Sequence, residues 1–131
     1  MPQPNQIPGT PQEWIERAKS NLAKAKISKS PEILWEDLCF DAQQTAEKAL
    51  KAVLLHKKIG FRYVHDLHEL ITSLMKNGID IPRTVEQAAG LTGYAVETRY
   101  PGIEPVSEEE YHQAVQIAEQ VLSWAESMIN S

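Results

Sequence analysis

The sequence predicts an all-α protein, an antiparallel bundle of about five helices, and three observations support this prediction. Apolar residues recur every three or four positions in several long segments, which is the spacing of one face of an α-helix. No segment shows the sustained alternation of apolar and polar residues, rich in β-branched side chains, that is typical of a strand. The eight prolines and six glycines lie mostly between the periodic segments, where they end helices and form turns.

The first predicted helix follows a flexible, proline-rich arm and runs to about Ile27. Residues 10–13, Thr-Pro-Gln-Glu, are typical of a helix start, with threonine as the N-cap, proline at the first helical position and glutamate at the third. The arm has neither the charged region nor the apolar region of a signal peptide, and the chain contains no apolar run long enough for a membrane span. We therefore expect an arm over residues 1–12 and a single helical domain over residues 13–131, in a cytoplasmic protein.

The second predicted helix is the longest, from Pro31 to about Lys58, and would be roughly 40 Å long. Ser30 before Pro31 repeats the pattern of a cap followed by proline. The apolar seam of this helix contains small residues that would let another helix approach closely, and polar side chains flank the seam. The seam residues are Leu38, Ala42, Thr45, Ala46, Ala49 and Val53, and the flanking polar residues are Gln43, Gln44, Glu47, Lys48 and Lys51.

Three further helices are predicted by the same spacing, over about residues 66–77, 83–98 and 107–129. The fourth helix has the weakest pattern, and Gly90 and Gly93 within it each cost ~1 kcal/mol relative to alanine, so we expect a break or bend there. The fifth helix begins with a capping box, Ser-Glu-Glu-Glu, whose acids lie at the positive end of the helix dipole. The first, second and fifth helices are the long ones, and we expect the bundle to be built on them.

Charge and cysteine content exclude some classes of function. The net charge of −5 argues against a simple electrostatic binder of nucleic acid. The charge is uneven, however, because residues 14–62 carry ten Lys and Arg against six Asp and Glu, whereas residues 100–131 carry six Glu and no Lys or Arg. This pattern fits either two solvated faces or complementary surfaces for a partner or an anion. Cys39 is the single cysteine, which excludes an internal disulfide and a cysteine-based zinc site, and its apolar surroundings indicate a core residue rather than a nucleophile.

A histidine and an aspartate lie where the third helix begins. His65 and Asp66 could act as a general base with its orienting carboxylate. The alternative is that Asp66 caps the helix, which explains the pair without a substrate. His56 and His112 have no partner at metal-ligand spacing, and His68 is expected on the surface, so no metal site is predicted.

Four basic or aromatic residues are candidates for contacts to an anion. The planar fork of Arg99 suits phosphate, and Tyr100 beside it could stack on a base. The alternative for Arg99 is that it satisfies the carbonyls at a helix end. Lys48 and Lys51 on the second helix could contact an anion, or they could be solvated positions beside the seam.

The order of these features resembles that of HEPN domains (higher eukaryotes and prokaryotes nucleotide-binding) over nearly the whole chain after residue 12. The most specific match is Gln-Gln-x-Ala-Glu-Lys-Ala-Leu-Lys at residues 43–51. Weaker matches are residues 14–18, 21–22, 37–42, 65–67 and 99–101. The resemblance implies a helical bundle similar to the domain appended to kanamycin nucleotidyltransferase. It also implies a homodimer formed by helix packing, and a minimal nucleotidyltransferase as partner in a toxin–antitoxin-like couple.

A dimer is also favoured by the sequence itself. A flat bundle with these tryptophans and small-residue seams has more apolar surface than a single chain can readily bury, so part of that surface is expected to be covered by a second chain. Those tryptophans are Trp14, Trp35 and Trp124.

One motif of the resembled family is missing. Many HEPN domains are metal-independent ribonucleases that use an Arg followed four to six residues later by a His. After Arg99 these positions hold Ile103, Glu104 and Pro105, and no general base is evident for attack of a 2′-hydroxyl on phosphate. Ribonuclease activity is therefore not expected, and a role in binding is favoured.

The leading interpretation is a non-catalytic, homodimeric HEPN-type module, without cofactor or metal, that binds a nucleotide or a nucleotide-bearing substrate beside a nucleotidyltransferase. Two alternatives remain open: an RNA-cleaving toxin that uses Arg99 with His65 as an unusual base, and a structural dimerisation module whose polar residues only solubilise the bundle. RNA is possible as a ligand but not favoured. The candidate ligand-binding residues are Gln44, Lys48, Lys51, His65, Asp66, Arg99 and Tyr100.

Overall fold

The computed structural model describes residues 8–61, 66–95, 101–102 and 104–131. In this part of the chain every regular element is a helix and no residue lies in a strand, which confirms the predicted all-α class. None of the described helices is both long enough and apolar enough to cross a membrane. The elements are α1 (Pro11–Ala25), α2 (Trp35–His56), α3 (Leu67–Lys76), the single turn α4 (Arg83–Glu86), the 3-10 helix η1 (Gln87–Ala95) and α5 (Glu108–Asn130).

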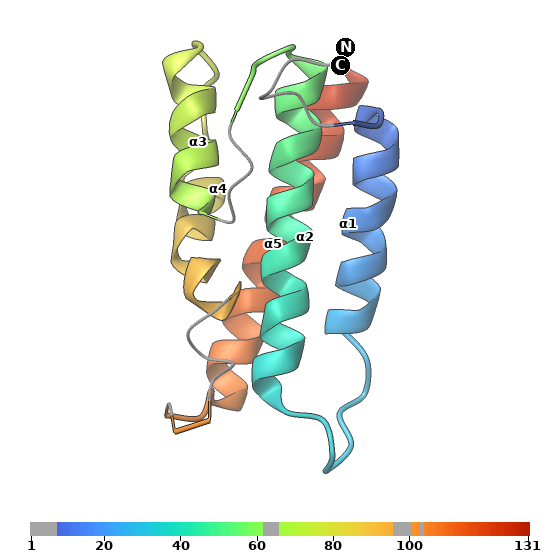
Figure 1. Ribbon diagram of the computed structural model, residues 1–131, viewed down its shortest axis with the longest axis vertical. Helices are drawn as coiled ribbons and strands as arrows, with labels where there is room; N and C mark the ends of the chain where they lie inside the picture. Colours follow the sequence, from blue (N-terminus) through green and yellow to red (C-terminus); the bar gives the residue numbers. More distant parts are fainter. Residues whose placement is uncertain (1–7, 62–65, 96–100, 103) are drawn as a thin grey trace.

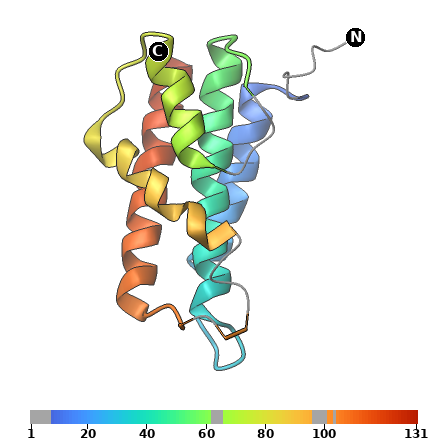
Figure 2. The same ribbon diagram turned by 60° about the vertical axis from the view of Figure 1, so that its left-hand side comes forward.

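The three long helices form the framework, as predicted. α2 packs most extensively on α1 and on α5, and α1 runs antiparallel to α2 (Figure 1). α3 and the α4–η1 segment lie across α2 and α5 on the side away from α1 (Figure 2). Because α2 is surrounded on several sides, it supplies more buried residues than any other helix. The predicted seam of α2 is confirmed, since all six of its residues are buried.

Local capping explains where α1 and α5 begin. Thr10 Oγ1 accepts a hydrogen bond from Glu13 N at 3.1 Å, and Glu13 Oε1 accepts one from Thr10 N at 2.8 Å. Ser107 and Glu110 form the same reciprocal pair at the start of α5. Both capping boxes are thereby confirmed, and each satisfies backbone N–H groups that a helix start leaves without a partner.

The predicted start of α2 at Pro31 is wrong by four residues. Residues 31–33 form a turn in which Ile33 N donates to Ser30 O at 3.1 Å, and α2 begins only at Trp35. Leu34 occupies the N-cap position without a side-chain hydrogen bond. The Trp35 ring lies 4.7 Å from the Tyr111 ring of α5, so packing between helices rather than a local cap accompanies the start of α2.

The predicted fourth α-helix is wrong over residues 87–95, which form the 3-10 helix η1; residues 96–98 lie outside the described residues. Val85, Ala88 and Leu91 are buried at a constant spacing of three, which matches the three residues per turn of a 3-10 helix. The two glycines within this segment lower the cost of leaving the α-helical conformation. Thr92 Oγ1 accepts a hydrogen bond from Leu67 N at 3.1 Å and so ties η1 to the first residue of α3.

Candidate functional site

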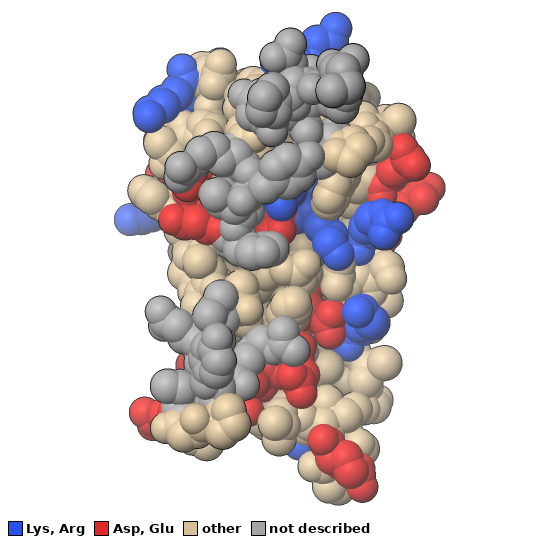
Figure 3. All heavy atoms as spheres, in the orientation of Figure 1, with Lys and Arg blue, Asp and Glu red and all other residues tan. Residues whose placement is uncertain are grey.

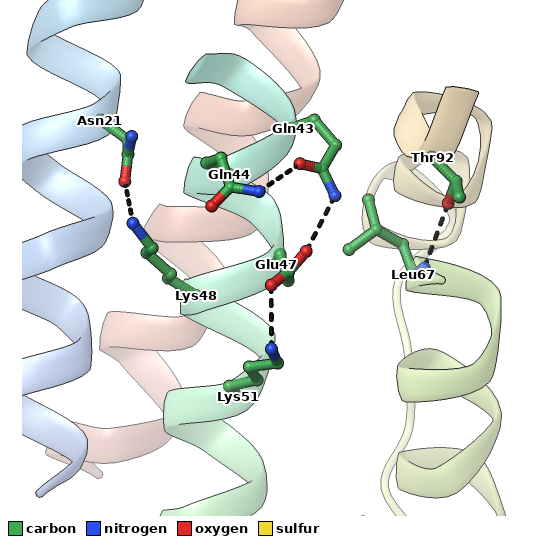
Figure 4. Close-up of polar contacts among 8 residues, drawn as sticks. All are labelled: Asn21, Gln43, Gln44, Glu47, Lys48, Lys51, Leu67 and Thr92. Carbon is green, nitrogen blue, oxygen red and sulfur yellow. Dashed lines mark hydrogen bonds and ion pairs between the residues drawn. The ribbon is translucent and has the colours of Figure 1, made fainter. Parts of the chain in front are cut away.

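A buried polar network runs along one face of α2 (Figure 4). Gln43 Nε2 donates to Glu47 Oε1 at 3.0 Å, and Lys51 Nζ donates to Glu47 Oε2 at 2.9 Å. The three residues are spaced by four, so they share a face, and their exposed fractions are only 0%, 3% and 6%. Gln44 Nε2 extends the network by donating to Gln43 Oε1 at 2.7 Å. The interpretation of Lys51 as a solvated residue is therefore wrong, because its charge is compensated by Glu47 in the interior.

A second network joins α2 to α1. Lys48 Nζ donates to Asn21 Oδ1 at 2.6 Å, and Figure 4 shows these two side chains directed toward one another across the helix pair. Asn21 Nδ2 donates in turn to Asp41 Oδ1 at 3.1 Å, and Lys24 Nζ lies 3.3 Å from the same carboxylate oxygen. The structure thus ties Lys48 to α1 through Asn21, whereas Lys51 is paired with Glu47 within α2.

Positive charge accumulates around Lys48. Burial lowers the pKa of its ammonium group, and the neighbouring cations of Lys24 and Arg17 add to this effect, while the carboxylates of Glu47 and Asp41 oppose it. Arg17 is exposed and makes no hydrogen bond or ion pair within the described part of the chain. In Figure 3, Lys and Arg side chains gather over α1 and the neighbouring part of α2.

Two of these cations, Arg17 and Lys48, line a surface hollow. Its volume is about 390 Å³, and its walls are Pro8, Gly9, Glu13, Trp14, Arg17 and Lys48. Trp14 Nε1 donates to Pro8 O at 3.0 Å, which holds the indole against the chain that precedes α1. Lys51 Nζ lies 5.9 Å from the centre of the Trp14 ring, so one indole lies beside both candidate lysines.

The hollow combines the groups that a phosphorylated ligand requires. A guanidinium forms paired hydrogen bonds to phosphate, and an ammonium group adds a point charge. An indole offers a flat face on which a base can stack. An anion bound at Arg17 and Lys48 would also offset the mutual repulsion of the cations. The arrangement therefore presents two cations and an indole, groups whose chemistry suits an anionic, partly aromatic ligand.

The remaining predicted residues divide into those that the structure describes and those that it does not. Asp66 caps α3, where its Oδ1 accepts a hydrogen bond from His68 N at 3.0 Å, which confirms the capping interpretation. His65, Arg99 and Tyr100 lie outside the described residues, and their roles stay predictions. Among the described residues, no three His, Cys, Asp or Glu side chains are grouped as a metal ion requires.

Of the six residues that line the hollow, only Lys48 was among the ligand-binding residues predicted from the sequence. Trp14 and Arg17 belong to α1, whereas Lys48 belongs to α2, and nothing local in the chain relates the two helices. A weak signal was present, because Trp14, Arg17 and Asn21 are spaced by three and four and so share one side of α1. Cys39 is fully buried, and burial raises its pKa to about 12, which agrees with its interpretation as a core residue.

Comparisons with known proteins point to one family. The family model for the HEPN domain matches residues 11–128. The crystal structure of TT1696 from Thermus thermophilus is similar, with 30% identity, a TM-score of 0.75, and coverage of 90% of this chain and 97% of that one. ST0689, an archaeal HEPN homologue, is similar with 25% identity and a TM-score of 0.72, over 93% of this chain and 99% of that one. No curated protein sequence matches. The chain therefore belongs to the HEPN domain family.

Proposed function

We propose that this protein is a non-catalytic, homodimeric HEPN module that binds a nucleotide or a nucleotide-bearing substrate and works beside a minimal nucleotidyltransferase in a toxin–antitoxin-like pair. The observation that carries the nucleotide-binding part is the hollow formed by Trp14, Arg17 and Lys48. Its volume of about 390 Å³ falls within the range of pockets that hold small ligands.

The charges favour a small ligand over a polyanion. Arg17 and Lys48 line the hollow as two cations, and Glu13 contributes a carboxylate to the same wall. The chain as a whole carries a net charge of −5, which repels an extended nucleic acid. A mononucleotide suits this hollow. Its phosphate would lie at the two cations and its base against Trp14, and the ligand would not extend beyond the hollow.

A second candidate is a purely structural dimerisation module. It is favoured by the hydrogen bonds that Lys48 and Lys51 already make, to Asn21 and Glu47 respectively. In that case the polar networks serve to align α1 with α2, and the hollow stays without a ligand.

Calorimetric titration separates these candidates. We expect a nucleoside monophosphate to bind, inorganic phosphate to bind more weakly, and the unphosphorylated nucleoside to bind least, with affinity falling as salt is added. Arg17→Gln should weaken binding roughly 10- to 100-fold, because charge-assisted hydrogen bonds are lost. The matched control is Arg83→Gln, which removes an exposed arginine from α4 and should leave affinity unchanged.

Three outcomes would contradict the proposal in different ways. If Arg17→Gln and Arg83→Gln weaken nucleotide affinity equally, the hollow is not the binding site. No binding of any nucleotide by an intact dimer would favour the structural module. Cleavage of RNA by the purified protein, abolished by His65→Ala, would favour the toxin. The nucleotidyltransferase partner is tested separately, by searching the adjacent open reading frame and co-purifying its product with this chain.

A further inference from the structure

The half-buried Lys48 differs in its partner from the lysines that pair with carboxylates. Its Nζ atom donates to the neutral carboxamide of Asn21 at 2.6 Å, and it forms no ion pair with any described residue (Figure 4). A neutral acceptor stabilises an ammonium group less than a carboxylate does, because it supplies a hydrogen bond without an opposite charge. Lys48 therefore lacks the direct ionic support that four other ammonium groups have. Those four lie within 3.3 Å of a carboxylate oxygen and are Lys19, Lys24, Lys26 and Lys51.

The charges that face Lys48 come from α1 and α2. Burial lowers the pKa of its ammonium group, and the cations of Lys24 and Arg17 on α1 lower it further. The carboxylates of Glu47 and Asp41 on α2 oppose this shift, but each of them is already paired with another lysine. At neutral pH a larger share of Lys48 is therefore the free amine than for a solvated lysine, and the free amine is the nucleophilic form.

The amine of Lys48 shares its hollow of about 390 Å³ with a group that suits phosphate. Arg17 lines the same hollow, is exposed, and makes no hydrogen bond or ion pair within the described part of the chain. Its guanidinium can donate two parallel N–H bonds to a phosphate group. Glu13 also lines the hollow, but its carboxylate accepts the capping hydrogen bond from Thr10 N at 2.8 Å. The hollow thus sets a nucleophile beside a site for phosphate.

We propose that Lys48 is a modification site that takes an acyl group from an acyl phosphate whose phosphate binds at Arg17. The Nζ atom attacks the carbonyl carbon, so a C–N bond forms and the bond from that carbon to the bridging oxygen breaks. Phosphate leaves with the electron pair of the broken bond, and the proton lost by the amine ends on the released phosphate. The product is an uncharged amide.

Modification of Lys48 would regulate the same hollow. The amide removes one of the two cations that line it, so an anionic ligand loses a charge-assisted contact. This consequence rests on the nucleotide binding of the proposed function, whereas the reactivity of the amine does not.

Treatment of the full-length protein with acetyl phosphate, followed by mass spectrometry, tests the site. At neutral pH Lys48 should be acetylated at least about tenfold faster than Lys76, and its rate should reach half-maximum at a lower pH. Lys76 is the matched control, because it is exposed in the last turn of α3 and has no partner among the described residues. If exposure alone governed the rate, Lys76 would react faster than the half-buried Lys48. Equal rates, or a faster Lys76, overturn the inference.

A second reagent tests the role of Arg17. Acetic anhydride transfers the same acyl group without a phosphate, so it reports on the amine alone. Arg17→Gln should lower the ratio of the Lys48 rate with acetyl phosphate to that with acetic anhydride by about tenfold, because charge-assisted hydrogen bonds to phosphate are lost. Arg83→Gln, which removes an exposed arginine from α4, should leave this ratio unchanged. An unchanged ratio in folded Arg17→Gln excludes the phosphate site and overturns the proposal.

Nucleotide binding is read separately. A nucleoside monophosphate should slow acetylation of Lys48 but not of Lys76, and the acetylated protein should bind that nucleotide at least about tenfold more weakly. If Lys48 reacts faster than Lys76 but no nucleotide protects it, the modification site is supported and the proposed nucleotide binding fails. If the nucleotide binds but Lys48 reacts no faster than Lys76, only the modification site is overturned.

Discussion

The ion pair of Lys51 and Glu47 provides a sharp test of the buried network on α2. Lys51 Nζ lies 2.9 Å from Glu47 Oε2, and the two side chains are 7% and 4% exposed. Lys51→Met keeps most of the side-chain volume but removes the ammonium group that pairs with the Glu47 carboxylate in the interior. Such a change typically costs about 3–5 kcal/mol of unfolding free energy. We expect about 3 kcal/mol, the lower end, because Glu47 keeps the hydrogen bond from Gln43 Nε2.

The matched control is a Lys–Glu ion pair at the surface with the same N–O distance. Lys26 Nζ lies 2.9 Å from Glu119 Oε2, but these side chains are 52% and 44% exposed. Lys26→Met should therefore cost less than about 1 kcal/mol. Urea unfolding followed by circular dichroism measures both losses, and thermal unfolding should show a fall in Tm of roughly 10 °C for Lys51→Met against a few degrees for the control.

A double variant completes the test. Lys51→Met combined with Glu47→Leu replaces the pair with apolar groups and should recover part of the stability lost by Lys51→Met alone, because it removes the buried carboxylate but also the acceptor of Gln43 Nε2. If Lys51→Met costs no more than Lys26→Met, burial does not govern the strength of this pair, and the reasoning about the network on α2 is refuted.

Two further predictions concern the buried thiol of Cys39 and the backbone conformation at two glycines. Burial raises the pKa of Cys39 from 9.0 to about 12, so the unfolded chain loses this proton first and stability falls as the pH rises from about 9 toward 12. Cys39→Ala should remove a slope of up to about 1.4 kcal/mol per pH unit, measured by urea unfolding across that range, and an unchanged slope would contradict the assignment. Gly90→Ala should stabilise the protein by about 0.4–1 kcal/mol, since nothing lies within 4 Å of the added methyl group, whereas Gly78→Ala should destabilise it, because Gly78 has a φ of +83°. Thermal unfolding of the two glycine variants should show Tm shifts of opposite sign.

Helix starts that are capped by a nearby side chain were predictable from the sequence. Thr10, Asp66 and Ser107 each accept a hydrogen bond from a backbone N–H two or three residues later, so the information lies within a few positions. The start of α2 was not predictable in the same way, because Leu34 makes no side-chain cap and Trp35 packs on Tyr111 of α5. The 3-10 geometry of η1 likewise depends on burial of Val85, Ala88 and Leu91 against other helices.

The candidate site was only partly predictable. Lys48 was identified beside the seam from helical spacing alone, but that spacing does not say which neighbour its ammonium group meets. Trp14 and Arg17 join it only because α1 packs against α2.

The sequence by itself determined the all-α class, the long seam of α2 and the capped helix ends, since each depends on residues within a few positions of one another. Only the tertiary structure decided which polar side chains of α2 are buried and which face α1. The distinction is physical: Lys48 and Lys51 have the same chemistry and lie three residues apart, yet Lys51 pairs with Glu47 in the interior and Lys48 meets Asn21 beside a hollow. The helices packed around α2 set how deeply each ammonium group is buried and which partner it meets.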